Sequence, residues 1–475
     1  MRRLYSAPIT KAFPDIDLPA ARLRKSVILI ARLVGRFYVS LHSGTASVVL
    51  RGGNHLFEAV RRAQEGKSRL IIAFRHPNGW EPQITMLFFL FKLRRLAAKN
   101  GVRFTRRAHA TFLYTYEVAR WGGWLFRFVM SGLGALPVYK SKVDAGSMAE
   151  IIKAIVDGSY PLALAPEGMV TYSASTVTHL EHGTARMGFR AAQLLHRMEP
   201  GCPVEIIPLS YHFRYGAPGR ITFAMLLRKT ERVCGFSGRE EPQLTFSQRA
   251  TRCRDHILAV NEKRYRTEGG SADEGGASLS FEQRLDRVVN RAMEAAERTI
   301  GVKPADGADI FSRMHHVNQA CWDRIFIPGV KSFRGRSLVE RSSADIQAGE
   351  AWYARRHTEL VDLCWFFKSA AVPEEDSAFH EKAEYMQNLW DFASRTMGGA
   401  YKNRRNILHK KVIMQAAPVI NLSERLPAYI EDKKAASMAV MQDLEKSYLD
   451  CIDAAESYES RSRENRHLRK RRNHE

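Results

Sequence analysis

The chain has 475 residues, of which 45% are hydrophobic and 26% charged, so its length allows about two to three domains with hydrophobic cores. Its net charge of +23 is concentrated in residues 1–150, which hold 25 Lys/Arg against 8 Asp/Glu, a net charge of +17. We therefore expect the N-terminal region to meet an anionic partner, which can be lipid headgroups, phosphorylated substrates or nucleic acid. The six cysteines form no CxxC pair, which argues against a disulfide framework or a zinc site.

The N-terminal segment 26–39 is the most apolar stretch, but Arg32 and Arg36 interrupt it, and it is shorter than the roughly 18 uncharged residues that a membrane span needs. The N-terminus lacks a cleavable apolar core followed by small residues, so we expect no signal peptide. At helical periodicity the two arginines lie opposite a stripe that includes Leu33 and Phe37. Two alternatives stay open: an amphipathic helix that lies on an anionic bilayer, or a core-packing helix with solvated arginines.

Up to residue 265, short apolar runs alternate with helical patterns. This alternation predicts an α/β domain with a central mixed sheet and flanking helices. The strands are expected at residues 70–74, 135–139, 162–165, 204–211 and 221–226. Between them, the pattern predicts a helix over 184–198.

Residues 266–280 are rich in glycine and serine and predict a flexible linker. The sequence is thus expected to divide into an α/β domain over 1–265, which includes the basic N-terminal helix, and an all-α bundle of unknown role over 281–460. A basic tail over 461–475 is expected to be disordered. The bundle helices are predicted at residues 281–300, 308–325, 344–369, 380–396 and 435–459, the first of them capped by Ser280 with Gln283.

The candidate site begins after the apolar run 70–74, where His76 is followed by a Pro-Asn-Gly turn. Glu81 lies five positions after the histidine. A histidine at the end of a buried strand, with a carboxylate able to fold back on it, has the geometry of an oriented general base. The alternative is structural: Asn78 and Glu81 have the N-cap and N3 spacing of a capping box, which would leave His76 a loop histidine.

Further polar residues follow neighbouring strands. The run 162–165 leads into Pro166-Glu167-Gly168, and Lys140 follows the run 135–139. Open α/β sheets bind ligands beyond the carboxyl ends of their strands, so we expect these residues and His76 to meet at one edge. A lysine at the place of Lys140 can pair with a phosphate or remain solvated.

These blocks, in this order, resemble the glycerolipid acyltransferases of the lysophosphatidate acyltransferase type. His76 to Glu81 resembles their His-x4-Asp motif, 134–140 their second block, Pro166-Glu167-Gly168 their Pro-Glu-Gly block, and 204–209 their strand with a central proline. The resemblance covers about residues 55–215. It departs from the family where Glu81 replaces the aspartate, Arg75 replaces an asparagine, and Met169-Val170-Thr171 lacks the family's phosphate-binding arginine.

The resemblance implies an acyltransferase-like fold and transfer of an acyl group from acyl-CoA or acyl carrier protein to a hydroxyl of a lysophospholipid or glycerol-phosphate acceptor in phospholipid biosynthesis. His76 would act as the general base and Glu81 would orient it. Lys140 and Glu167 would position the acceptor, and donors near Gly168 would stabilise the oxyanion.

Arg186 or Arg75 would replace the missing phosphate-binding arginine. No metal or organic cofactor is implied, and the expected location is cytoplasmic, peripheral on the inner face of the cell membrane. The alternative from another class is a non-catalytic protein whose basic N-terminal region binds anionic lipid or nucleic acid. Nucleic acid is the less favoured partner, because no recognised nucleic-acid-binding module accompanies the charge.

Overall fold

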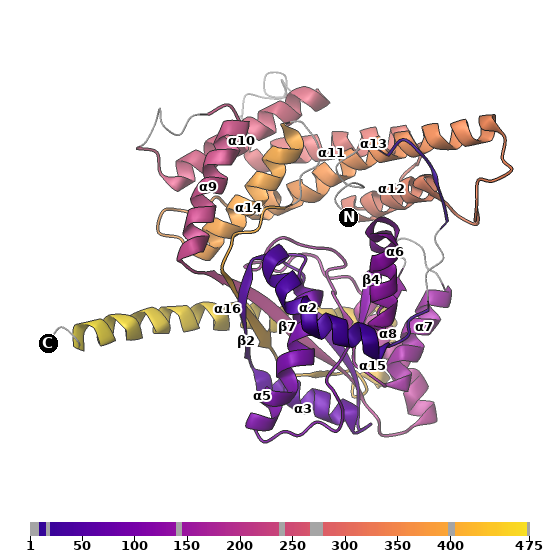
Figure 1. Cartoon of the computed structure of the whole chain (residues 1–475), viewed down its shortest axis with the longest axis vertical. Helices are drawn as coiled ribbons and strands as arrows, with labels where there is room; N and C mark the ends of the chain where they lie inside the picture. The colour runs from indigo at the N-terminus through magenta and orange to yellow at the C-terminus, as the bar shows by residue number, and fades with distance from the viewer. Residues whose placement is uncertain are drawn as a thin grey trace.

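The computed structural model describes residues 9–15, 20–138, 145–236, 243–266, 279–397 and 404–472. They form a mixed sheet flanked by helices, with a second group of helices packed beside it (Figure 1). The α/β class and the mixed central sheet are therefore confirmed. The linker residues 267–278 and Lys140 lie outside the described residues.

The central sheet has the strand order β2-β9-β7-β3-β6-β4-β5, with β10 paired to β7. Strands β7, β3, β6, β4 and β5 are parallel to one another, whereas β9 is antiparallel to β7 and parallel to β2. A separate short parallel pair joins β1 (Phe13–Pro14) to β8 (Phe326–Ile327). The strands of the central sheet are β2 (Thr45–Arg51), β3 (Arg69–Phe74), β4 (Thr111–Thr115), β5 (Leu136–Val138), β6 (Leu162–Leu164), β7 (Val204–Tyr215), β9 (Lys410–Ala416) and β10 (Ile420–Asn421).

Four of the five predicted strands correspond to β3, β5, β6 and β7, but the strand predicted at 221–226 is wrong. That segment lies in helix α9 (Ala217–Val233), which has a proline in its first turn. Leu226 and Leu227 are buried while Ile221 and Met225 are exposed, so the apolar run has one buried and one exposed helical face rather than strand alternation.

The prediction of an all-helical segment over 281–460 is also wrong, because β9 and β10 belong to the central sheet. Strand β9 lies between β2 and β7 and pairs with both. Its run Val412-Ile413-Met414 is short, and short apolar runs do not distinguish a strand from a helix by periodicity. The C-terminal part of the chain therefore completes the sheet that carries His76.

Helices cover both faces of the sheet, as the alternation in β3 requires. Leu70, Ile72 and Phe74 join a core on one face, whereas Ile71 and Ala73 join a core on the other. The helices packed around the sheet are α2 (Lys25–Ser43), α3 (Gly53–Gln64), α4 (Glu81–Phe88), the π-helical turn η1 (Phe89–Leu93), α5 (Arg94–Lys99), α6 (Tyr116–Gly132), α7 (Ala145–Asp157), α8 (Gly183–Met198), α15 (Leu426–Glu431) and α16 (Lys433–Arg472).

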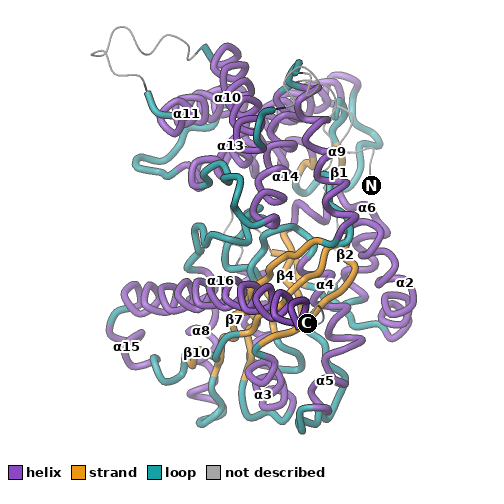
Figure 2. Tube along the Cα trace, turned by 90° about the vertical axis from the view of Figure 1, so that its left-hand side faces the viewer, coloured by secondary structure: helices purple, strands orange, loops and turns teal. Residues whose placement is uncertain are grey.

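Helix α16 lies across one face of the sheet (Figure 2) and buries Val440, Leu444 and Tyr448 there. Helix α16 continues to Arg472, into the stretch that was expected to be a disordered tail, and Figure 1 shows this end pointing away from the rest of the chain. Arginine, glutamate and lysine favour helix, and the packed first half of α16 supplies the nucleus that an isolated helix lacks.

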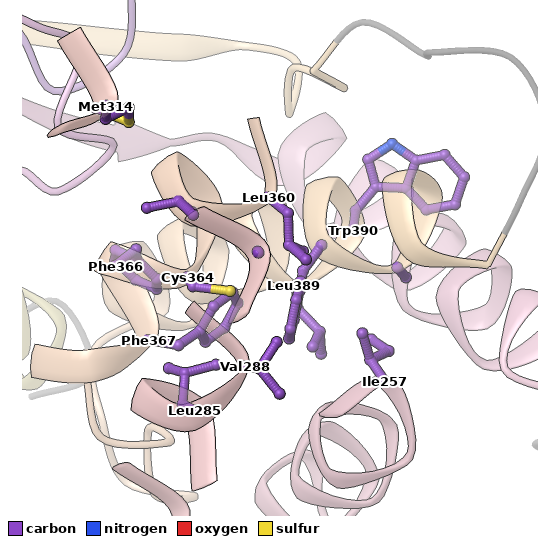
Figure 3. Close-up of a cluster of buried hydrophobic side chains, with 14 of the residues drawn as sticks. Ile257, Leu285, Val288, Met314, Leu360, Cys364, Phe366, Phe367, Leu389 and Trp390 are labelled. Atoms are coloured by element: carbon purple, nitrogen blue, oxygen red, sulfur yellow. The ribbon is translucent and has the colours of Figure 1, made fainter. Parts of the chain in front are cut away.

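The second group of helices contains the predicted helices over 281–396, joined by α9 and α10 from before the predicted linker. Figure 3 shows part of their common core, to which Ile257 of α10, Leu285 and Val288 of α11 and Leu389 of α14 all contribute. The predicted Ser280–Gln283 capping box is confirmed. The helices after α9 are α10 (Phe246–Tyr265), α11 (Phe281–Ile300), α12 (Ile310–Ile325), α13 (Leu338–Ser369) and α14 (Phe379–Thr396).

Helix α2 is amphipathic, but its apolar stripe faces outward. Leu33 is 73% exposed and Phe37 is 69% exposed, whereas Arg32 is half-buried with its guanidinium over the ring of Phe91. The stripe is therefore not the face that packs on the core, although Val27 and Val39 of the same helix are buried there and Arg36 is exposed. None of the described helices is both long and apolar enough to cross a bilayer.

Candidate functional site

The candidate site lies where β3 and β6 end side by side. The two strands are parallel neighbours, with Ala73 opposite Leu164, so the segments that follow them leave the sheet at the same edge. Here the backbone N–H of His76 donates to Glu167 Oε2 at 2.6 Å, and the carbonyl of His76 accepts from the backbone N–H of Thr171 at 3.0 Å. The predicted meeting of His76 and Glu167 is thus found, and both main-chain polar groups of His76 are held by the segment after β6.

The side chain of His76 is paired with Glu81. Its Nδ1 lies 2.7 Å from Glu81 Oε2, and because a carboxylate only accepts, Nδ1 carries the proton. The Glu81 carboxylate is fully buried, whereas the His76 side chain is 18% exposed. This tautomer leaves the lone pair on Nε2, so the ring has the arrangement of an oriented base.

The capping-box alternative does not describe Glu81. Helix α4 begins at Glu81 itself, its N-cap is Trp80, and no side chain caps it. Glu81 Oε2 accepts from the backbone N–H of Gly79 at 2.8 Å in addition to His76, and the Asn78 side chain points to another partner. The carboxylate therefore binds both the backbone of the Pro-Asn-Gly turn and the imidazole of His76.

The two carboxylate oxygens of Glu81 differ in their hydrogen bonds. Oε1 has no hydrogen-bond partner among the described residues. The backbone carbonyl of Glu81 accepts from the Thr85 hydroxyl, which is also hydrogen-bonded to the hydroxyl of Tyr211. Burial raises the pKa of Tyr211 well above its usual value, so this phenol remains protonated.

Arg75 and Glu167 form a buried ion pair beneath the site, with Nε of Arg75 3.3 Å from Glu167 Oε1. Burial raises the pKa of Glu167, while the charge of Arg75 and the His76 N–H oppose this shift. Arg75 also donates to the carbonyls of Ser173, Ala174 and Thr176. It is fully buried, so the phosphate-binding role predicted for it does not fit; it holds the loop after β6 in place.

Glu167 is equally buried, so it acts on the His76 backbone, and its burial does not fit the predicted contact with an acceptor. Gly168 has φ +66°, a backbone conformation that strains residues with a side chain, so glycine is favoured there. Its N–H donates to the carbonyl of Ala165 and is not a free oxyanion donor. Arg186 is exposed on α8.

Three residues from the C-terminal part support this edge of the sheet, and sequence reasoning missed them. Lys410 Nζ donates to Asn78 Oδ1 at 2.9 Å, and the Tyr448 hydroxyl donates to the carbonyl of Ala73 at 2.9 Å. Glu384 of α14 accepts from the backbone N–H of Ala174 at 2.7 Å. No local pattern marks any of them, because each meets its partner more than 200 positions away.

A small cavity adjoins the His76 turn. Its wall contains Pro77 and Asn78 of the turn together with Glu384 and Arg404 from the C-terminal part. Among the described residues, His380, Glu381 and Glu456 have ligand atoms within 4.8 Å of one another. His380 also lines the cavity beside the His76 turn.

Comparison with known proteins finds no matching family model, curated protein or solved structure. Function is therefore inferred from the geometry. An imidazole whose Nδ1–H is bonded to a buried carboxylate can accept a proton at Nε2 from a hydroxyl or thiol group.

Proposed function

We propose that this chain is an O-acyltransferase of glycerolipid type, which moves an acyl group from acyl-CoA or acyl carrier protein to a hydroxyl of a lysophospholipid or glycerol-phosphate acceptor. The observation that carries the proposal is the 2.7 Å contact between His76 Nδ1 and the buried carboxylate of Glu81. The resemblance of the motif order to the glycerolipid acyltransferases selects acyl transfer among the reactions that such a pair can serve.

In the proposed reaction, His76 Nε2 accepts the acceptor's hydroxyl proton while the oxygen attacks the thioester carbonyl. The tetrahedral intermediate then collapses, the carbon–sulfur bond breaks, and the imidazolium returns the proton to the thiolate. Glu81 stabilises the imidazolium and holds the tautomer. Glu167 acts only indirectly, because it fixes the backbone of His76. The step needs neither a metal nor an organic cofactor.

The proposal includes peripheral attachment to an anionic membrane. The end of helix α6 meets the start of α2, since the Arg24 N–H donates to the carbonyl of Gly132, and α6 also carries exposed apolar side chains, including Trp124. Apolar surface of this extent on neighbouring helices marks an interaction site, and the +17 charge of residues 1–150 favours an anionic lipid surface.

The test of catalysis offers the purified protein a panel of acyl donors and lysolipids and identifies products by mass spectrometry. His76→Ala should lower the rate by about 10²–10⁴. His55→Ala is the matched control, since His55 is an exposed histidine on α3. No product from the wild type with any donor and acceptor, or a His76→Ala variant within a few-fold of wild type, would count against the proposal.

The test of attachment uses cosedimentation with anionic vesicles. Replacing Leu33 and Phe37 together by aspartate should weaken binding at least about tenfold, because each apolar side chain that leaves water contributes about 1.5–3 kcal/mol. Leu338→Asp is the control, because Leu338 is 80% exposed on the distant helix α13. Equal losses for both variants, or none, would place the membrane contact elsewhere. Vesicle binding without acyl transfer would favour the non-catalytic lipid-binding alternative.

A further inference from the structure

The turn between His76 and Glu81 is anchored by a lysine from the far end of the chain. Lys410 is the first residue of β9, and its Nζ donates to Asn78 Oδ1 at 2.9 Å. Its backbone is fixed on both sides, opposite Thr45 of β2 and Tyr215 of β7. Lys410 is 1% exposed, so its amine lies away from solvent.

This lysine lies in the electrostatic field of the buried Glu81 carboxylate. Burial lowers the pKa of Lys410 to about 7, while the charge of Glu81 opposes the shift and that of Arg404 adds to it. Its nitrogen also lies 4.9 Å from the centroid of the Phe213 ring. A buried amine is costly unless it has partners, and here its hydrogen-bond acceptor is the Asn78 side chain.

Several contacts thus hold the turn. The backbone of His76 is bound to Glu167 and Thr171, the imidazole is bound to Glu81, and the side chain of Asn78 is bound to Lys410. The first two attachments fix the ends of the turn. Between these ends, the Gly79 N–H donates to Glu81 Oε2, and Lys410 fixes the side chain of Asn78.

We propose that Lys410 is a positioning residue of the site, which acts through Asn78 to hold the turn that sets the His76 imidazole against Glu81. The catalytic part of this inference rests on the proposed acyl transfer, whereas the positioning of His76 does not. The C-terminal part of the chain would accordingly complete the site as well as the sheet.

The test compares Lys410→Met, which keeps the length of the side chain but removes its donor, with Lys411→Met, Asn78→Ala and the Lys410→Met/Asn78→Ala double variant. Lys411 is the matched control because it is the adjacent lysine and is exposed. The first readout is the rate at which diethyl pyrocarbonate modifies His76, followed by peptide mass spectrometry, with exposed His55 as the internal standard.

Lys410→Met should speed His76 modification at least about threefold, since opening the turn no longer breaks a hydrogen bond from this amine. Asn78→Ala should act in the same direction, and the double variant should be no faster than the faster single variant, because both changes break one contact. Lys411→Met should match wild type. An unchanged His76 rate in a folded Lys410→Met protein, or additive effects in the double variant, would overturn the proposal.

The second readout is the acyl-transfer rate. Lys410→Met should lower kcat with little change in KM, and Lys410→Gln, which restores an N–H donor, should recover part of the loss. If wild type transfers no acyl group, the proposed function fails while the modification rates still decide the role of Lys410. If Lys410→Met does not fold, Asn78→Ala tests the same contact from the turn, and a wild-type His76 rate in that variant would overturn the proposal.

Discussion

The packing of α16 on the sheet can be tested without reference to any activity, by Leu444→Ala. Leu444 is fully buried in the core that contains Ile71 and Ala73 of β3. The substitution removes three carbon atoms, a transfer loss of about 2.4 kcal/mol at about 0.8 kcal/mol each. The cavity left behind brings the expected loss of unfolding free energy to about 3–5 kcal/mol.

The matched control is Leu449→Ala on the same helix, because Leu449 is 46% exposed and its loss should change stability by no more than about 0.5 kcal/mol. Urea unfolding followed by tryptophan fluorescence gives the two free energies. Hydrogen exchange of peptides that cover β3 and β9 should rise in Leu444→Ala alone. Equal stability of the two variants, or faster exchange confined to α16, would show that this helix is not part of the core beneath His76.

Three further predictions address the pair, the pH dependence and the division of the chain. Glu81→Gln should lower turnover by about 10³–10⁴ with little change in melting temperature, and Glu81→Asp should recover part of the rate; normal turnover in Glu81→Gln would assign Glu81 a structural role only. Burial lowers the pKa of His212 to about 3. As the pH falls, the His212 side chain is protonated in the unfolded chain before it is protonated in the folded protein. The free energy of unfolding should therefore be highest above about pH 6.5 and fall by up to about 1.4 kcal/mol per pH unit as the pH drops toward 3. His212→Gln should flatten this slope in urea titrations, whereas His55→Gln should not, and equal slopes would refute the assignment. A 1–265 fragment should not form a protease-resistant α/β unit, because β9 would be missing between β2 and β7. Coexpression with 279–475 should restore solubility. A fragment that is stable alone would contradict this prediction.

Much of the candidate site was predictable because its signals are local. The apolar run of β3, the Pro-Asn-Gly turn and Glu81 lie within about a dozen positions, so strand, turn and carboxylate can be placed without knowledge of the rest of the chain. The same holds for the helices over 281–396, whose periodic apolar faces and caps are properties of each segment.

The roles of charged residues near the site depended on burial, which the sequence does not state. Arg75 was a plausible phosphate ligand by charge alone, but three carbonyls and Glu167 surround its guanidinium. The outward direction of the apolar stripe on α2 was likewise undecided by its periodicity. A helical pattern shows that two faces differ, and only the neighbouring elements determine which one is covered.

By itself the sequence determined the local elements, the His76–Glu81 spacing and the basic character of the N-terminal region. The tertiary structure decided that β9 enters the middle of the sheet and that α16 covers one face of it. It also decided that Lys410 reaches Asn78 across 332 positions. Such contacts have no local signature because they form between side chains that only the folded backbone brings together, and their free energy depends on the burial that the whole fold creates.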